Sequence, residues 1–468
     1  MTARSGHVYK EGRESATANR KEQALSHRLT VIGTGYLGAT HAACMADLGF
    51  EVLGLDVDAE KIARLSAGDL PVYEPGLEPV LRRGLETGRL RFTTSYEEVA
   101  EFGDVHFLCV GTPQKAGEYA ADLTYVDEAV ASLAPLLRRP CLVVGKSTVP
   151  VGTAARLADV LAKAAPAGGD AVLAWNPEFL REGFAVQDTL HPDRIVAGLP
   201  AEQGAAAHAE KVLREVYRAM LAEGTPFITA DFPTAELVKV SANAFLATKI
   251  SFINAMAEVC EAAHADVTKL SEALSYDDRI GGKFLGPGLG FGGGCLPKDI
   301  RAFMARAGEL GADQALTFLR EVDEINIRRR IRMVDLARQL LGGSFVGRTV
   351  GVLGAAFKPN SDDVRDSPAL DVAASIRAQG AKVTVYDPQA MRNARRAQPS
   401  LEYGDSALAA FQDAHVVLLL TEWAEFRGMD PYEVAENVAE RNIVDGRNAL
   451  DPERWRAAGW NYRALGRP

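Results

Sequence analysis

Short apolar runs alternate with longer amphipathic stretches along most of this chain. An apolar run at residues 29–32 leads into a glycine-rich turn, a helix-like stretch extends to Leu48, and a second apolar run follows at 51–55. Further runs of strand length lie at 105–110, 142–145 and 172–174. Strands that alternate with helices form parallel sheets with helices on both faces. Residues 28–205 are therefore predicted to fold as one doubly wound α/β domain.

The pattern changes after residue 205. Between 206 and 335 the strand-like signal is confined to 226–229, and from 234 to 263 the chain is rich in alanine, with apolar residues three and four positions apart. Such spacing predicts a long helix that is buried along one face. A helix of this kind could join two domains and form a dimer interface, so residues 206–335 are predicted to be a central helical dimerisation region.

The last block, residues 336–468, repeats the order of the first. It contains a run that ends in glycine, GRTVGVLGAAFK, then a helix-like SPALDVAASIRAQG and a run that ends in aspartate, AKVTVYDP. Because it lacks the first block's glycine pattern, we expect it to bind something other than a dinucleotide. The sequence thus predicts an α/β protein of two Rossmann-like doubly wound domains joined by a long central helix. Residues 1–27, which are polar and charged, are predicted to be a disordered tail.

Composition and charge narrow the possible classes of function. The chain has 468 residues, of which 47% are hydrophobic and 24% are charged, as is ordinary for a soluble globular protein. A net charge of −10 without a basic run argues against nucleic-acid binding. No apolar run approaches the roughly 18 residues of a transmembrane helix. Five cysteines without a CxxC pair favour reduced thiols in a cytoplasmic protein over disulfides or a metal site.

A glycine pattern and an acidic residue indicate a dinucleotide site. Gly33, Gly35 and Gly38 form GxGxxG between a predicted strand and helix, and Asp56 ends the next strand, 18 residues after Gly38. Glycines permit a tight turn and the close approach of a pyrophosphate, which the helix N-terminus attracts. A carboxylate at Asp56 can accept hydrogen bonds from ribose hydroxyls and would repel a 2′-phosphate. The pattern therefore predicts NAD rather than NADP as cofactor, with a glycine turn used only for packing as the alternative.

A second glycine-rich segment, GKFLGPGLGFGGGCLPKD at 282–299, holds six glycines between 286 and 294. Each glycine costs conformational entropy on folding, so we expect this loop to wrap its backbone around a ligand. If a helix begins at Pro297, Cys295 lies at its N-terminus beside Lys298, and both features favour a thiolate. Cys295 is therefore a candidate nucleophile, with a buried inert cysteine as the alternative.

Polar residues recur where a ligand is expected to bind. Lys239 and Asn243 lie one turn apart on the predicted long helix and so share a face. Ligands of open α/β sheets bind outside the carboxyl ends of strands, and polar residues follow such ends at Thr112, Thr148, Glu178 and Glu182. Basic residues stand beside turns at Arg279, Lys283, Lys358, Arg365 and Arg447. Arginine forks suit phosphate oxygens, so the set predicts an anionic ligand, although each residue singly is equally typical of a solvated loop.

Nine motifs occur in a telling order: GTGYLG, YEPGL (73–77), VGTP, STVPVGT, NPEFLREG, the helix with Lys239 and Asn243, GGGCLPKD, AAFKPNSDDVRDSP and DGRN (445–448). From about residue 28 to residue 465 the chain resembles the UDP-glucose/GDP-mannose dehydrogenase family of nucleotide-sugar dehydrogenases. The resemblance implies a four-electron oxidation in which a primary alcohol at sugar C6 becomes a carboxylate and two NAD become NADH. The segments 73–77 and 421–426 favour UDP-glucose, with UDP-glucuronate as product, and GDP-mannose is the alternative.

The resemblance also implies roles for individual residues. Cys295 would be the nucleophile of a thiohemiacetal and a thioester, and the other catalytic residues would be Lys239, Asn243, Asp299, Thr148 and Glu182. The implied cofactor contacts are Gly33, Gly35, Tyr36, Leu37, Gly38, Asp56, Lys61, Thr112, Thr148, Lys298 and Arg365. The implied substrate contacts are Glu178, Phe179, Leu180, Glu182, Lys239, Asn243, Arg279, Phe284, Leu285, Gly292, Phe357, Lys358 and Arg447. Arg279 would reach the substrate across the interface of a homodimer, and no metal is implied.

These roles agree with ordinary carbonyl chemistry. A base takes the hydroxyl proton as the first hydride leaves, a thiolate attacks the aldehyde, and Lys239 and Asn243 can stabilise the oxyanion. Gly294 stands where serine is commoner in the family, which removes a hydroxyl beside Cys295 but keeps the nucleophile. Two interpretations outside the family stay open. One is an ordinary two-electron hydroxyacid dehydrogenase, which would not need Cys295, and the other is a NAD-binding regulator without turnover.

Overall fold

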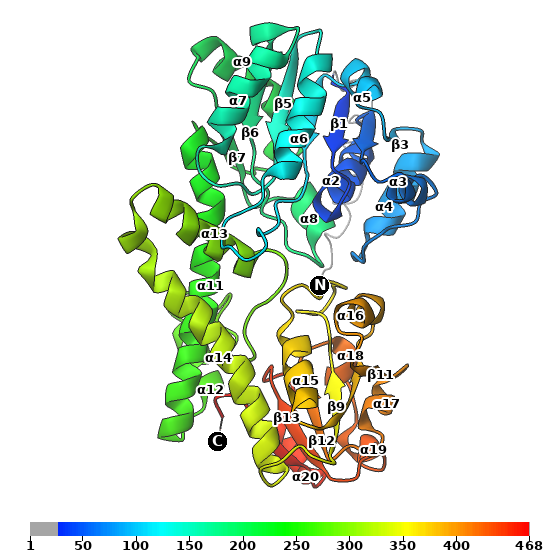
Figure 1. Cartoon of the computed structure of the whole chain (residues 1–468), viewed down its shortest axis with the longest axis vertical. Coiled ribbons are helices and arrows are strands. Elements are labelled where there is room, and N and C mark those ends of the chain that lie inside the picture. The colour runs from blue at the N-terminus through cyan, green and yellow to red at the C-terminus, as the bar shows by residue number, and fades with distance from the viewer. Residues whose placement is uncertain (1–26, 468) are drawn as a thin grey trace, which may run out of the picture.

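The computed structural model describes residues 27–467. Two sheet domains lie at opposite ends of its long axis, and long helices run along one side and join them (Figure 1). Apart from His27, the tail predicted for residues 1–27 lies outside the described residues.

The first domain is built on an eight-stranded sheet with the order β3-β2-β1-β4-β5-β6-β7-β8. Its strands are β1 (Leu29–Ile32), β2 (Val52–Leu55), β3 (Leu90–Thr93), β4 (Val105–Leu108), β5 (Cys141–Gly145), β6 (Ala171–Trp175), β7 (Ile195–Leu199) and β8 (Phe227–Asp231). The first six have the strand order of dinucleotide-binding domains. Strand β7 pairs antiparallel with β6, so the sheet is not wholly parallel as expected. Because β8 then pairs with β7, the sheet continues past residue 205.

Helices cover both faces of this sheet and enclose two layers of core. On one face lie α2 (Tyr36–Asp47), α4 (Leu77–Glu86), α8 (Ala185–Leu190), α9 (Gln203–Val216) and α10 (Arg218–Ala222), and on the other α5 (Tyr96–Phe102), α6 (Thr124–Leu133) and α7 (Thr153–Ala164). Shorter pieces are α3 (Ala59–Ser66) and the 3₁₀ turns Ala134–Leu136 and Gly168–Asp170. All four residues of β1 and of β4 are buried, as in a sheet covered on both sides.

The central region consists of four helices and one 3₁₀ turn: α11 (Phe232–Ala263), α12 (Val267–Ser275), α13 (Leu296–Glu309), Asp313–Leu316 and α14 (Thr317–Leu340). The predicted long helix is confirmed as α11, whose first turn is capped by the Asp231 side chain. Its end is marked by His264, which has a left-handed φ of 56°. Helix α14 lies beside α11, where Ser251 donates a hydrogen bond to the carbonyl of Val322 at 2.7 Å, and it leads into the second domain (Figure 1).

The second domain holds a six-stranded parallel sheet with the order β11-β10-β9-β12-β13-β14. Its strands are β9 (Thr349–Leu353), β10 (Lys382–Tyr386), β11 (Glu402–Tyr403), β12 (Val416–Leu419), β13 (Asn442–Asp445) and β14 (Asn461–Ala464). Its helices are α15 (Pro368–Ala378), α16 (Met391–Ala397), α17 (Ala407–Phe411), α18 (Ala424–Arg427), α19 (Pro431–Val434) and α20 (Pro452–Ala457). This is the strand order of the first domain again, which confirms two Rossmann-like domains. No helix within residues 27–467 is long and apolar enough to span a bilayer.

Candidate active site

The three glycines of the turn after β1 have three different surroundings. Gly33 has a left-handed φ of 89°, and a Cβ there would lie 2.8 Å from the backbone nitrogen of Val110. A Cβ on Gly38 would lie 1.8 Å from the carbonyl oxygen of Gly33, so helix and strand can approach only without a side chain. At Gly35 a Cβ would meet no described atom within 4 Å. Space therefore remains beside the N-terminus of α2, where backbone N–H groups can bind an anion.

A pocket of about 470 Å³ lies next to this turn. Its lining includes Gly33, Gly35, Asp56, Lys61, Tyr96, Gly111, Tyr125, Glu128 and Ser132. Asp56 accepts hydrogen bonds from the Thr34 backbone and from Lys61 Nζ, each at 2.9 Å. Burial alone would raise the pKa of Asp56, but Lys61 and the backbone donors lower it, so the carboxylate is ionised. Tyr96, Tyr125 and Glu128 have no motif in the sequence, and only the packing of α5 and α6 against the sheet reveals them.

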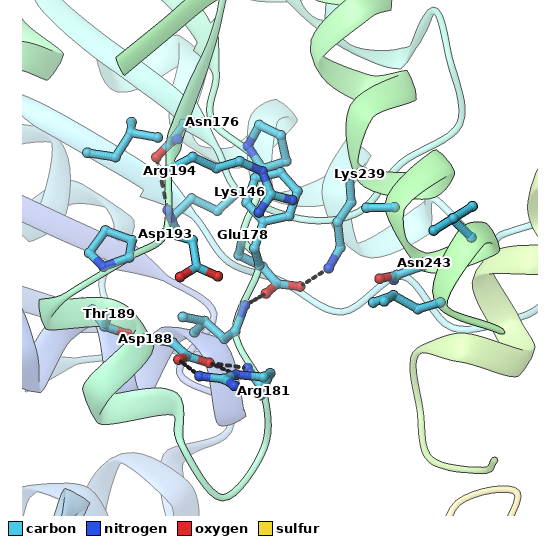
Figure 2. Close-up of a pocket in the computed structure, with 18 of the residues that line it drawn as sticks. Lys146, Asn176, Glu178, Arg181, Asp188, Thr189, Asp193, Arg194, Lys239 and Asn243 are labelled. Atoms are coloured by element: carbon cyan, nitrogen blue, oxygen red, sulfur yellow. Dashed lines mark hydrogen bonds and ion pairs between the residues drawn. The ribbon is translucent and has the colours of Figure 1, made fainter. Parts of the chain in front are cut away.

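The polar residues of the two central helices meet at one point. Asn243 on α11 donates a hydrogen bond to Asp299 Oδ2 at 2.6 Å, and Lys298 Nζ lies 2.6 Å from Asp299 Oδ1. Lys239, one turn before Asn243, forms a buried ion pair with Glu178 at 2.9 Å (Figure 2). Burial alone would lower the pKa of Lys239, but the carboxylates of Glu178 and Asp299 raise it. Lys239 is therefore a stable cation in the middle of the cluster.

Cys295 directly precedes α13 and is an exposed residue in this single chain. Surrounding protein and then the neighbouring carboxylates of Asp299 and Glu178 raise the pKa of the Cys295 thiol to about 12, against the influence of Lys239. The thiolate that we expected from the helix N-terminus and Lys298 is therefore not favoured here. The Lys298 ammonium is engaged by Asp299, so its charge is largely neutralised. For Cys295 to act as a nucleophile, a base would have to remove the thiol proton.

Thr112 and Thr148 join two strand-end loops. The Thr112 hydroxyl donates to the carbonyl of Thr148 at 2.7 Å. Thr148, Lys298 and Asp299 line one small cavity of about 20 Å³, which brings Thr148 to the carboxylate at the centre of the cluster. Glu236 of α11 anchors the same loop by accepting hydrogen bonds from the Gly152 and Ala154 backbones, each at 2.7 Å.

Glu182 lies on the loop between β6 and α8, and its neighbours come from the second domain. Ser361 Oγ donates to Glu182 Oε2 at 2.9 Å, and Arg365 lies 3.6 Å from Oε1. Burial, followed by the nearby charge of Asp363, raises the pKa of Glu182 to about 7. A carboxyl group with this pKa can accept or release a proton at neutral pH.

The glycine-rich segment is packed tightly against the second domain. A Cβ would lie 2.8 Å from the Phe357 ring at Gly293, 2.1 Å from the Arg365 guanidinium at Gly294 and 2.4 Å from a backbone oxygen of Asp366 at Gly292. These glycines are thus required for contact between two parts of the protein. The expectation that this loop wraps its backbone around a ligand stays a prediction, and packing against the second domain is a further reason for its glycines.

A pocket of about 210 Å³ lies between α11, this segment and the second domain. It is lined by Ile250, Phe284, Gly286, Pro287, Gly288, Gly290, Glu422 and Arg447. Arg447 donates hydrogen bonds to the carbonyls of Leu420 and Gly290, each at 2.8 Å. Lys358 of the second domain lies near Glu182, with Glu74 and Arg181 as further charged neighbours.

A larger pocket of about 440 Å³ opens on the other side of the Lys239–Glu178 pair (Figure 2). Phe179 and Leu180 line it beside Glu178, and the Arg194 guanidinium lies 3.8 Å from the centre of the Phe179 ring. Lys146 and Asn176 form its polar floor, joined at 2.9 Å. Arg194, Lys146 and Asn176 were missed from the sequence, because each is one polar residue in a loop or strand end with no partner nearby in the chain.

Three predicted residues lie away from the cluster within this single chain. Arg279 is paired with Asp277 at 2.7 Å, and its side chain is 89% exposed. Leu285 is buried against α11 and α12, and Leu37 packs partly into the core of the first domain. For Leu285 and Leu37, contact with a ligand is therefore left to the backbone.

Three family models match the chain in succession. They are the NAD binding domain of the UDP-glucose/GDP-mannose dehydrogenase family at residues 27–221, its central domain at 233–328 and its UDP binding domain at 351–452. UDP-glucose 6-dehydrogenase of Rhizobium meliloti is 38% identical, over 94% of this chain and 100% of that protein. UDP-glucose 6-dehydrogenase TuaD of Bacillus subtilis is 40% identical, over 94% and 93%. A UDP-glucose dehydrogenase structure from Pyrobaculum islandicum has a TM-score of 0.86 and 38% identity, covering 96% of this chain and 99% of its own.

Proposed function

Since the chain belongs to the UDP-glucose/GDP-mannose dehydrogenase family, we propose that it oxidises UDP-glucose to UDP-glucuronate by a covalent route through Cys295. The reaction is NAD-dependent, and the protein is an oxidoreductase. One observation carries the proposal: Cys295, Lys239, Asn243 and Asp299 form a single polar cluster beside the pocket that Lys239 and Asn243 line. GDP-mannose is the weaker candidate substrate, because the relatives named above act on UDP-glucose.

The residues around the glycine turn fit NAD. The open space at Gly35 suits the pyrophosphate, and Asp56 with Lys61 suits the ribose hydroxyls, where a 2′-phosphate would meet the carboxylate. When bound, NAD supplies the acceptor for each hydride. The remaining chemistry belongs to the chain's own residues.

The first task of the cluster is to stabilise charge on the sugar oxygen. As a proton leaves the C6 hydroxyl, the Lys239 ammonium and the Asn243 amide can donate hydrogen bonds to the developing oxyanion. Glu178 holds Lys239 from the other side at 2.9 Å, which fixes the direction of the ammonium group. Asp299 and Thr148 lie next to one small cavity and can pass the proton onward through a water.

The second task is covalent. Loss of the first hydride with the hydroxyl proton leaves an aldehyde. The Cys295 thiol then passes its proton through the water near Asp299 to the aldehyde oxygen as its sulfur bonds to the aldehyde carbon, which gives a thiohemiacetal. Loss of a second hydride and the hydroxyl proton gives a thioester. A water deprotonated by Glu182 then attacks the thioester carbon, the carbon–sulfur bond breaks, and the acid and the thiol are regenerated. The pKa of about 7 at Glu182 suits a base that works at neutral pH.

The nucleotide part of the substrate belongs beside the second domain. A nucleotide-sugar ligand is supported by the match to the UDP binding domain. The pocket of Phe284 and Arg447 offers a cation for one phosphate of the nucleotide, and Lys358 can neutralise another. Phe179 and Leu180 line the larger pocket, which also reaches Phe284.

The quaternary structure that we propose is a homodimer. Phe245, Phe252 and Val259 recur every seven residues along α11 with 66%, 48% and 58% of their surfaces exposed. Such a stripe on a helix is typical of an interface. Pairing through it would also give Arg279 a role at the partner's substrate site. We place the dimer in the cytoplasm, because all five cysteines are free.

The test counts NADH formed per sugar consumed, with UDP-glucose, GDP-mannose and an N-acetylated nucleotide sugar supplied separately. Two NADH per UDP-glucose are expected, and Cys295→Ser should stop formation of the acid. The matched control is Cys260→Ala. It changes a buried cysteine of α11 that lies outside the polar cluster, so it should keep turnover. One NADH per sugar, or acid formation by Cys295→Ser, would refute the covalent route.

A further inference from the structure

A buried carboxylate that the mechanism does not use lies between the cofactor turn and the Glu182 loop. Glu74 is 4% exposed and precedes α4. Its Oε2 accepts a hydrogen bond from the Gly183 backbone at 2.6 Å, and its Oε1 accepts one from the Ala185 backbone at 2.8 Å. Within residues 27–467 no Lys or Arg forms an ion pair with it. The two backbone N–H groups therefore hold the Glu74 carboxyl group in place.

These two hydrogen bonds fix the chain directly after Glu182. Gly183 is the next residue, with a left-handed φ of 80°, and Ala185 begins α8. A Cβ on Gly183 would lie 2.9 Å from the backbone oxygen of Asn360, so the loop also touches the second domain here. The Glu182 backbone thus has little freedom while Glu74 keeps both donors.

Glu74 is joined to the cofactor turn as well. Tyr36 follows Gly35 and opens α2, and its hydroxyl donates to Glu74 Oε2 and accepts from the Gly183 backbone at 3.2 Å. Burial, followed by the charge of Glu74, raises the pKa of Tyr36, so its hydroxyl stays a donor. Helices α2, α4 and α8 lie next to one another where the first domain faces the second (Figure 1).

The second domain completes the junction from the other side. The Tyr73 backbone donates to Asp362 Oδ1 at 3.2 Å, and the adjacent Ser361 donates to the Glu182 carboxylate at 2.9 Å. The side chain of Glu182 is thus held by the second domain, while its backbone is held by Glu74.

We propose that Glu74 is a positioning residue for Glu182. By fixing the backbone after Glu182, it orients the Glu182 carboxylate toward the water that hydrolyses the thioester. The inference rests on the proposed function, because it assigns a supporting part to the base named there. Glu74 touches neither α11 nor α13 through its hydrogen bonds, and these helices carry Lys239, Asn243 and Cys295. Loss of Glu74 therefore slows hydrolysis selectively and leaves both oxidations nearly unchanged.

The experiment is rapid mixing of Glu74→Gln with saturating UDP-glucose and NAD. A glutamine keeps the size but turns an NH₂ group toward one of the two backbone donors. We expect a burst of two NADH per site, followed by a steady state slower by about 10- to 100-fold, the range that misplacement of a catalytic group produces. Glu182→Gln should give the same burst. The matched control is Glu202→Gln. Glu202 caps α9 by accepting hydrogen bonds from the Gly204 and Ala205 backbones, outside the polar cluster, so this variant should keep wild-type rates.

Tyr36→Phe provides a second variant that removes one hydroxyl. It should show a smaller loss of hydrolysis, and its effect should not add to that of Glu74→Gln. Equal slowing of oxidation and hydrolysis in Glu74→Gln, with no burst, would overturn the inference if Glu182→Gln still shows the burst. Absence of a burst in Glu182→Gln would instead contradict the base named in the proposed function, and the inference would fall with it.

Discussion

Replacing Gly35 with alanine should weaken NAD binding and leave the stability of the fold nearly unchanged. Gly38→Ala should instead lower the stability of the fold. The two glycines belong to the same turn and lie three residues apart. The difference is that the space at Gly35 is open and the space at Gly38 is filled by the carbonyl of Gly33. The pair therefore separates the role of a glycine in folding from its role in cofactor binding.

The magnitudes follow from the geometry. A Cβ on Gly38 would lie 1.8 Å from the Gly33 oxygen, within a fully buried part of α2, so helix and sheet must move apart. Overpacking of this kind costs about 1–3 kcal/mol, and we expect the upper end because the obstacle is backbone. Gly35 has φ −71° and ψ −162°, which alanine adopts freely. Alanine is a poorer N-cap than glycine, which lowers the free energy of unfolding, but it also restricts the unfolded chain, which raises it. The two effects nearly cancel, within about 1 kcal/mol.

Two measurements test this reasoning. Denaturant unfolding of the protein without cofactor gives the change in free energy, and calorimetric titration gives the Kd for NAD. Gly35→Ala should raise that Kd at least about tenfold, which is about 1.4 kcal/mol, while Gly38→Ala lowers the unfolding midpoint. Equal destabilisation by both substitutions, or an unchanged Kd in Gly35→Ala, would refute the assignment of the open space to the pyrophosphate.

Three further predictions concern pH, cofactor choice and assembly. Because the pKa of Glu182 is raised to about 7, its base form is lost as the pH falls, so kcat should drop about tenfold per unit below pH 7. Asp363→Asn removes a nearby negative charge and should move this limb of the kcat profile to lower pH; an unmoved limb would contradict the cause given. Asp56→Asn should raise kcat/KM for NADP relative to NAD, and an unchanged ratio would argue against repulsion of the 2′-phosphate. Phe252→Glu should give monomers by sedimentation and, since Arg279 then loses its partner site, little turnover; fully active monomers would contradict the dimer.

Much of the fold could be predicted because it depends on local patterns. The strand at 29–32 and the helix ending at Ala263 were placed within about two residues, since apolar spacing and glycine stops act over a few positions. Strands β3, β7, β11, β13 and β14 were not predicted. Their residues are too few and too mixed to stand out, and pairing with neighbours in the sheet makes them strands.

The candidate site shows the same division. The glycine turn, Asp56 and Cys295 could be found from spacing alone. Glu74 drew attention only as part of a motif, and its hydrogen bonds to a loop more than 100 residues away could not be read from the chain. The expected thiolate at Cys295 shows the limit most clearly, because the pKa of the thiol depends on its burial and then on the carboxylates of Asp299 and Glu178, and Glu178 comes from the first domain.

The sequence by itself determined the two α/β blocks with a long helix between them, the dinucleotide turn and the set of reactive side chains, because these follow from residue type and from contacts within a few positions. The tertiary structure alone decided beside which glycines the space is occupied by other protein atoms and beside which it is open to a ligand. It also decided that Glu182 meets Ser361 and Asp363. Burial and long-range electrostatics set the proton affinity of each group, and both depend on residues that the fold, rather than the chain, brings together.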